Sequence, residues 1–176
     1  RGAAADRGTP VLEAKGLVPI VCPLVRTVDV PGPAVRGESY AWLVVTSARA
    51  AETLAERVAG RLPAVAAVGP GTAEALRVHQ IEPRLVAWES TQEGLVRELR
   101  PRLEPGDRVL FAGAAGARDV IARELDADVV VLYRTEEETV ECFPEADLVV
   151  LASASAARAF ARLGIDGTAQ YLIRPD

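Results

Sequence analysis

The stretch Trp42-Leu-Val-Val-Thr-Ser-Ala-Arg-Ala-Ala51 gives the clearest structural signal in this 176-residue sequence. Four apolar residues end in a Thr-Ser step, and apolar residues then recur at helical spacing as far as Leu62. A short, continuous apolar run is typical of a strand that is covered on both faces of a sheet. The pattern therefore predicts a buried strand, a hydroxyl-bearing turn and a helix.

The same alternation continues to the middle of the chain. Further strands are expected at residues 64–68, 84–87, 108–111 and 128–132. Helices are expected from Thr72, after Gly116, and from a capping box at Ser90-Thr-Gln-Glu93. Strands that alternate with helices of this length indicate an α/β protein whose parallel sheet has helices on both faces. Residues 36–135 are therefore predicted to form one domain.

The two flanks of that domain resemble each other. A strand is expected at 17–24 and another at 147–151, while 26–37 and 135–143 are predicted to be linkers. Leu148-Val-Val-Leu-Ala-Ser-Ala-Ser-Ala-Ala157 has the pattern of the opening stretch, which indicates duplication.

Gly71-Thr-Ala73 likewise recurs as Gly167-Thr-Ala169. We predict that residues 1–35 and 136–176 form a first, discontinuous domain into which 36–135 is inserted. We expect this first domain to be incomplete in this chain, because too few residues are present to finish its sheet.

Composition excludes several classes of function. A net charge of −5 with scattered arginines argues against a nucleic-acid partner, which requires clustered cations. No apolar run reaches the roughly 18 residues of a membrane span, and no secretory signal opens the sequence, so a cytoplasmic protein is expected. One histidine, His79, and two distant cysteines, Cys22 and Cys142, offer no metal site. We expect neither a metal nor a cofactor.

Four turns share one design, in which a strand ends in small or hydroxyl residues that open a helix. They are Thr46-Ser47, Gly69-Pro-Gly-Thr72, Gly113-Ala-Ala-Gly116 and Ser153-Ala-Ser155. Helix N-termini attract carboxylates and phosphates through unpaired N–H groups, and the carboxyl ends of parallel strands meet at one edge. The turns therefore predict a binding site for an anion. The alternative is that these residues are ordinary helix caps and turn residues.

Tyr133 stands at the end of the last strand of the predicted domain. Its phenol can donate a proton to a departing oxygen as a general acid, or the ring can simply pack at the domain edge. Trp42 and Trp88 are expected to pack in the core or at its rim. Arg118 and Asp119 can form an exposed ion pair, or Arg118 can reach an anionic ligand.

In order and spacing, these segments resemble the uroporphyrinogen-III synthase family. The matching segments are Trp42 to Ala51, Ala67-Val-Gly-Pro-Gly-Thr-Ala-Glu-Ala-Leu76, Thr91-Gln-Glu-Gly-Leu95, Arg108-Val-Leu-Phe-Ala-Gly113, Ala117-Arg-Asp119, Leu132-Tyr133 and Leu148 to Phe160. The resemblance implies two flavodoxin-like, doubly wound parallel-sheet domains joined by a two-stranded linker, the second domain inserted into the first.

The resemblance also implies an activity. The expected enzyme is a cofactor-free lyase that closes hydroxymethylbilane, a linear tetrapyrrole with eight carboxylates, into uroporphyrinogen III with ring D inverted. The implied protein is a monomer that contacts hydroxymethylbilane synthase transiently.

The resemblance and the four turns together define the candidate site. Tyr133 matches the family tyrosine that assists hydroxyl departure and is the expected catalytic residue. The expected substrate-binding residues are Thr46, Ser47, Gly69, Thr72, Gly113, Ser153 and Ser155. The sequence departs from the family pattern at Ala152 and Ala154.

Two other interpretations stay open at this point. The four turns would equally suit a non-catalytic two-domain binding module for a small polyanion. The chain could also be a synthase-like domain without activity.

Overall fold

The structure is a computed structural model that describes residues 9–140, 143–151, 153–164 and 170–173. It divides into two compact units. Unit 1 consists of Arg1–Thr27 and Thr135–Asp176, and unit 2 is Val28–Arg134. Each unit is described by itself.

Unit 2 is built on a parallel sheet. Its strands are β2 (Trp42–Val45), β3 (Ala64–Ala67), β4 (Leu85–Val86), β5 (Val109–Ala114) and β6 (Asp128–Glu137). They lie in the order β6-β5-β2-β3-β4, with parallel pairing throughout. The strand order reverses between β2 and β5, which makes the sheet doubly wound.

The strand order corrects one expectation. Counted along the chain, the order in unit 2 is 3-2-1-4-5, whereas a flavodoxin has the order 2-1-3-4-5. The difference arises because the chain continues outward from β3 to β4 before it crosses back to β5 on the other side of β2.

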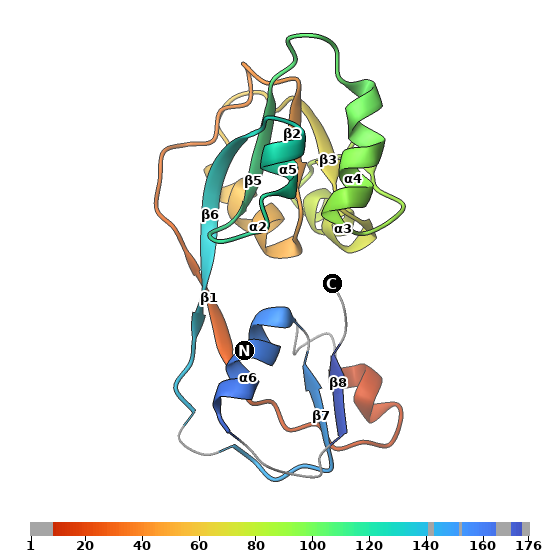
Figure 1. The fold of residues 1–176 in the computed structure, drawn as a ribbon, viewed down its shortest axis with the longest axis vertical. Helices are drawn as coiled ribbons and strands as arrows, with labels where there is room; N and C mark the ends of the chain where they lie inside the picture. Colours follow the sequence, from red (N-terminus) through yellow and green to blue (C-terminus); the bar gives the residue numbers. More distant parts are fainter. Residues whose placement is uncertain (1–8, 141–142, 152, 165–169, 174–176) are drawn as a thin grey trace. The chain divides into compact units, whose positions relative to one another are not determined.

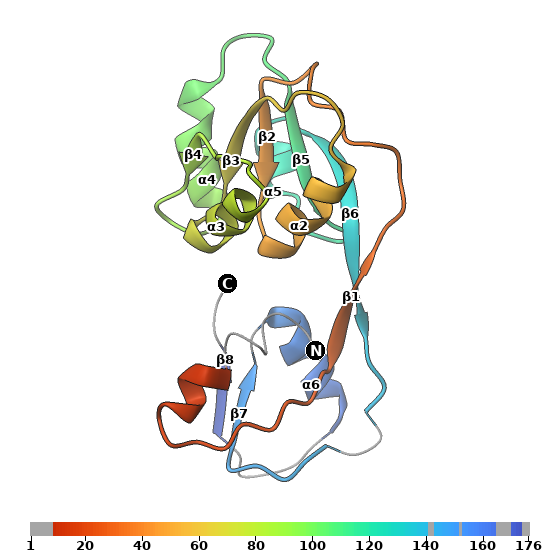
Figure 2. The ribbon, with the colours of Figure 1, turned by 180° about the vertical axis from the view of Figure 1, so that it is seen from behind.

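Helices cover both faces of this sheet (Figures 1 and 2). Successive side chains of β2 point to opposite faces, so Leu43 and Val45 belong to one apolar cluster and Trp42 and Val44 to another. The first cluster packs beneath α2 (Ala48–Arg57) and α3 (Pro70–Val78). The second packs beneath α4 (Gln92–Leu99) and α5 (Val120–Glu124). The continuous apolar runs of the sequence reflect this double cover.

Three helix starts differ from those predicted. The α4 helix is capped by Thr91, whose hydroxyl accepts from the Gly94 N–H, so the box based on Ser90 is one residue out of register. The α3 helix begins at Pro70 rather than at Thr72. The Gly113–Gly116 turn opens no helix directly, because α5 begins only at Val120 and has five residues. A short 3-10 turn, η1 (Arg100–Arg102), follows α4.

The strand β1 (Val25–Asp29) completes the six-stranded sheet beside β6. The Val30 N–H donates to the Leu132 carbonyl at 2.8 Å, and the Glu138 N–H donates to the Leu24 carbonyl at 2.9 Å. As the residue number rises along the first strand, from 24 to 30, the number of its partner falls, from 138 to 132. The two strands are therefore antiparallel. One expectation is thus corrected, because no strand forms at 17–24. The predicted linkers 26–37 and 135–143 each contain part of a strand, as a two-stranded linker implies.

The segment 17–24 fails as a strand because it has no ladder among the described residues. Two of its apolar side chains, Val18 and Ile20, are 90% and 62% exposed. An apolar run becomes a strand only where another backbone is available to pair with it.

Unit 1 has its own small core. The strands β7 (Leu148–Leu151) and β8 (Gln170–Ile173) pair in parallel, and α6 (Ala154–Arg162) packs on β7. Phe143 meets Phe160 of α6 edge to face, with ring centroids 5.2 Å apart. Residues 9–13 are also helical. Cys142, Ala152 and the predicted repeat Gly167-Thr-Ala169 lie outside the described residues.

Candidate active site

Three neighbouring strands of unit 2 end at the same edge of the sheet. Their register pairs Val45 of β2 with Ala67 of β3 and with Ala112 of β5. The residues at and just after these strand ends therefore lie along one edge. They include Thr46, Ser47 and Gly69, and Gly113 within the last residues of β5. Ligands of open α/β sheets bind at this carboxyl edge, where the strand order reverses.

Ser47 caps the helix that follows β2. Its backbone is extended, with φ of −155° and ψ of 154°, and its Oγ accepts the Ala50 N–H at 3.0 Å. This is the usual geometry of a serine N-cap. The same Oγ lies 3.0 Å from the hydroxyl oxygen of Tyr133. The structure thus joins the predicted catalytic residue directly to one predicted substrate-binding residue.

A β-bulge directs Tyr133 toward Ser47. Gly113 pairs with Val131 but Ala114 pairs with Tyr133, so Leu132 is an extra residue in β6. Regular alternation would send the side chains of Leu132 and Tyr133 to opposite faces of the sheet. Both are instead buried in the apolar cluster beneath α2 and α3. The irregular register therefore places the phenol on the same side as α2.

Gly69 and Thr72 belong to the turn that opens α3. A side chain at Gly69 would meet Ser90, because a Cβ at this position would lie 2.3 Å from Ser90 Oγ. Thr72 is buried, with 6% of its surface exposed, in the first turn of the helix. Gly113 is closely packed too, since a Cβ there would lie 2.9 Å from the Phe111 ring. Packing alone accounts for glycine at 69 and 113.

An ionic cluster that the sequence analysis missed holds the first turns of α2. Arg49 donates to the Asp29 carboxylate at 2.5 Å and to Glu52 at 3.2 Å, and the Thr53 hydroxyl donates to Asp29 at 3.1 Å. Burial disfavours the guanidinium charge, but hydrogen bonds to Glu52 and the charge of Asp29 outweigh this and raise the pKa of Arg49. No local sequence signal links Asp29 to α2, because the link depends on the pairing of β1 with β6.

Ser153 and Ser155 belong to unit 1 rather than to unit 2. Ser153 follows β7 and caps α6, accepting the Ala156 N–H at 3.1 Å, and its Oγ lies 3.1 Å from that of Ser155. The local design repeats that of Ser47 and α2. Its association with the unit 2 residues stays a prediction.

The structure corrects the expectations for Trp88 and for the partner of Arg118. Trp42 is buried as expected, but Trp88 is 95% exposed and packs neither in the core nor at its rim. Arg118 pairs with Glu93, at 2.7 Å and 3.2 Å, rather than with Asp119. A hydrogen bond from the backbone of Glu93 to its own carboxylate, together with the bonds from Arg118, holds the pKa of the Glu93 carboxyl below its usual value.

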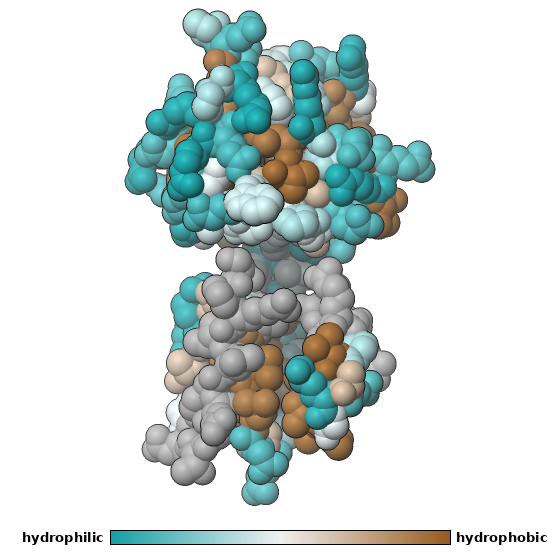
Figure 3. All heavy atoms as spheres, turned by 90° about the vertical axis from the view of Figure 1, so that its right-hand side faces the viewer, coloured by the Kyte–Doolittle hydropathy of each residue, from teal (hydrophilic) through white to brown (hydrophobic). Residues whose placement is uncertain are grey.

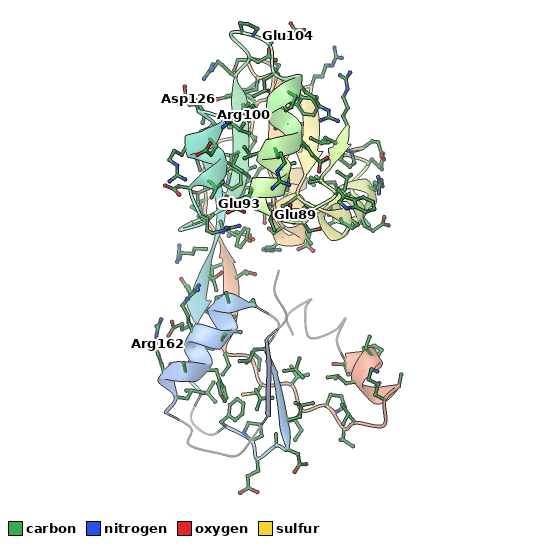
Figure 4. All side chains as sticks on the ribbon, turned by 45° about the vertical axis from the view of Figure 1, so that its right-hand side comes forward. Glu89, Glu93, Arg100, Glu104, Asp126 and Arg162 are labelled. Carbon is green, nitrogen blue, oxygen red and sulfur yellow. The ribbon has the colours of Figure 1, made fainter. Side chains whose placement is uncertain are left out.

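A shallow groove of about 440 Å³ lies elsewhere in unit 2, between α4 and α5. Glu93, Arg97, Arg100, Arg123 and Glu124 line much of it, and none of the predicted site residues does. Glu93 and Arg100 lie along α4 and its C-terminal end in Figure 4. The cations are largely matched by carboxylates, Arg97 by Glu89 and Arg100 by Glu124. The face of this unit that Figure 3 shows is mostly hydrophilic, with some hydrophobic atoms among the polar ones. We therefore place the candidate site at the carboxyl edge and not in this groove.

Within the described ranges, no three His, Cys, Asp or Glu side chains gather as metal ligands would. No helix in that part of the chain has the length and apolar character needed to cross a bilayer.

Comparison with known proteins gives one consistent result. The family model described as "Uroporphyrinogen-III synthase HemD" matches residues 6–171. A protein of Methanocaldococcus jannaschii named "Putative uroporphyrinogen-III synthase" is 26% identical over 140 aligned residues, and the match covers 76% of this chain. The chain spans 58% of the length of that relative.

Solved structures of uroporphyrinogen III synthases share the fold. The Helicobacter pylori 26695 protein has a TM-score of 0.60 at 19% identity. The match covers 85% of this chain and 74% of the Helicobacter pylori chain. A mutant of the Thermus thermophilus protein has a TM-score of 0.59 at 15% identity, covering 92% and 74%. These likenesses establish an α/β fold with a mainly parallel sheet, and the family match covers most of the sequence. The chain belongs to the uroporphyrinogen-III synthase HemD family.

Proposed function

We propose that this chain carries out the uroporphyrinogen-III synthase reaction, in which hydroxymethylbilane is cyclised with inversion of ring D and loss of water. The observation that carries the proposal is the hydrogen-bonded pair Ser47–Tyr133 at the carboxyl edge of the unit 2 sheet. In a member of this family, a phenol held at a ligand-binding edge supplies the one proton donor that the first step needs.

The first step is the departure of the terminal hydroxyl. The C–O bond breaks, its electron pair stays on the oxygen, and the oxygen takes the Tyr133 proton and leaves as water. The pyrrole nitrogen stabilises the resulting cation, and its N–H proton returns to the phenolate to give an azafulvene and restore Tyr133. Tyr133 therefore gives up one proton and regains one within this step.

Ring closure follows without further consumption of protons. The substituted carbon of ring D attacks the azafulvene carbon and forms a spiro intermediate, which fragments and recloses with ring D inverted. The net change is the loss of one water. Because spontaneous closure yields the uninverted type I isomer, the protein acts mainly by holding the chain in the productive conformation.

Binding of the eight carboxylates would use backbone donors. The N-termini of α2, α3 and α6 follow strand ends and are capped by Ser47, Gly69 and Ser153. Such helix starts favour anions by their unpaired N–H groups and partial positive charge. Thr46, Thr72, Gly113 and Ser155 complete the proposed substrate contacts.

The proposed architecture has two doubly wound domains joined by the β1–β6 pair, with unit 2 inserted into the chain of the other domain. A monomeric, cytoplasmic enzyme that contacts hydroxymethylbilane synthase only transiently is part of the same proposal.

The test supplies hydroxymethylbilane enzymatically and measures which uroporphyrinogen isomer accumulates. Type III above the spontaneous type I background supports the synthase. Tyr133→Phe should lower kcat by about 10²-fold, the smaller end of general-acid effects, and leave product binding nearly unchanged. Type I alone, with tight binding of the porphyrinogen, would instead identify a non-catalytic binding module for a polyanion.

A further inference from the structure

The Ser47 and Tyr133 hydroxyls have one proton each, and the surrounding bonds limit where those protons lie. Ser47 Oγ already accepts the Ala50 N–H at 3.0 Å. Tyr133 is the acceptor available to the Ser47 proton, at 3.0 Å, and among the described residues no other group bonds to the Tyr133 hydroxyl. The 3.0 Å contact by itself allows either hydroxyl to donate.

A phenol that acts as a general acid must keep its proton free for the substrate, and one direction of the chain does so. The Ala50 N–H donates to Ser47, and Ser47 donates to Tyr133. The Tyr133 proton is then left to donate outward. Hydrogen bonds in such a chain polarise one another, so the chain also makes the phenol a better donor.

We propose that Ser47 is the positioning residue for Tyr133: its hydroxyl holds the phenol oxygen as an acceptor and leaves the phenol proton available to the substrate. This inference rests on the proposed function and changes the role of Ser47 within it. Ser47 acts on the reaction through Tyr133 rather than as a direct substrate contact.

The surroundings hold this pair in place from both sides. The bulge at Leu132 directs the phenol toward α2, and the Asp29 contacts with Arg49 and Thr53 hold the first turns of the helix that begins after Ser47. Tyr133 is 9% exposed, so its ring has little freedom to turn away from Ser47. A rigid donor geometry is what positioning requires.

A double-mutant cycle tests the coupling. Ser47→Gly should lower kcat by about tenfold with little change in KM, the size expected for one neutral hydrogen bond. In the Tyr133→Phe background, Ser47→Gly should have no further effect on kcat. Ser47→Thr keeps a hydroxyl and a good N-cap, so it should restore most of the activity.

Thr91→Gly is the matched control. Thr91 caps α4 with the same geometry, accepting the Gly94 N–H at 3.0 Å, and within the described ranges no hydrogen bond joins it to a tyrosine. Glycine is itself a tolerated N-cap, so both glycine variants should fold. The control measures what the loss of a capping hydroxyl costs by itself.

A second measurement is independent of turnover. With ¹³Cζ-labelled tyrosine, the Tyr133 resonance is identified by its loss in Tyr133→Phe. It should move in Ser47→Gly and stay in place in Thr91→Gly.

The outcomes separate the inference from the proposed function. A Tyr133 resonance unmoved by Ser47→Gly, an equal loss of kcat in both backgrounds, or a loss confined to KM would overturn the positioning role while type III formation stands. Type I product alone from the wild-type chain would overturn the proposed function and, with it, the catalytic role of the pair.

Discussion

Asp29 of β1 lies opposite Tyr133 of β6, and the side chains of both residues bond to α2 or its cap. The position follows from the adjacent bond, in which the Val30 N–H donates to the Leu132 carbonyl of the antiparallel partner. Asp29 accepts from Arg49 and Thr53, while Tyr133 bonds to Ser47. One cross-strand pair therefore holds both the N-cap and the first turns of the helix.

Removal of the Asp29 carboxylate should loosen this connection. Asp29→Ala takes two hydrogen bonds from α2 and leaves Arg49, whose side chain is 33% exposed, with Glu52 as its acidic partner. We expect a loss of roughly 1 kcal/mol in the free energy of unfolding, because the ion pair is only partly buried. Urea denaturation measures it.

Asp29→Asn separates charge from hydrogen bonding in the same experiment. The amide oxygen can still accept from Thr53, so this variant should lose less stability than Asp29→Ala. Equal losses in the two variants would show that the charge of Asp29 carries the whole contribution.

The packing of Gly69 against Ser90 predicts a clash and its rescue. Gly69→Ala would place a Cβ 2.3 Å from Ser90 Oγ and 2.9 Å from Ser90 Cβ, so we expect a loss of about 1–3 kcal/mol. Replacing Ser90 by glycine removes both atoms and should recover most of the loss. Thermal and urea unfolding of the single and double variants tests this.

Gly71 is the matched control for Gly69. A Cβ at Gly71 would have no atom within 4 Å, and the residue lies in the first turn of α3. Gly71→Ala should therefore be neutral or stabilise the protein by up to about 1 kcal/mol, through helix propensity and a less flexible unfolded chain. A destabilised Gly71→Ala protein would contradict the packing argument.

The surface cluster of Tyr40, Arg108 and Asp128 predicts a pH-dependent contribution to stability. Hydrogen bonds from Arg108 and from Tyr40 hold the pKa of Asp128 below its usual value of 3.8. A lowered folded-state pKa gives stability that is present above pH 3.8 and lost as the pH falls through the folded-state value. Asp128→Asn should therefore be less stable than the wild type at about pH 6, and the difference should disappear in acid.

Chemical denaturation of both proteins from about pH 6 down to the acid limit would measure that difference. A gap that persists at the lowest pH would mean that Asp128 contributes by packing and not by charge.

The two tryptophans should report separately on the protein. Trp88 is 95% exposed and Trp42 is 7% exposed. Trp88→Phe should shift the remaining fluorescence to shorter wavelength and reduce quenching by acrylamide, because the buried Trp42 remains. Strong quenching that survives in Trp88→Phe would contradict the burial of Trp42.

Local patterns in the sequence were sufficient to predict strands at the positions of β2 to β6 and two of the helix caps. Successive side chains of Trp42–Val45 point to opposite faces of the sheet, and each face has its own apolar cluster. Every residue of this strand is therefore apolar, and the sequence shows no alternation of apolar and polar residues. Ser47 and Ser153 were predictable as helix starts because a capping hydroxyl bonds only three residues ahead. Such features depend on neighbours in the chain.

Long-range pairing decided the rest. The strand order and the contact of Asp29 with α2 depend on which backbones pair, and Tyr133 meets a partner 86 residues away in the sequence. The extra residue at Leu132 is visible only in the register with β5. Residues 17–24 have the composition of a strand, but the described structure provides no ladder for them. The sequence by itself determined which segments could be buried. Tertiary pairing decided which side chains meet, because the partner in a long-range hydrogen bond is far away in the sequence and cannot be predicted from a local pattern.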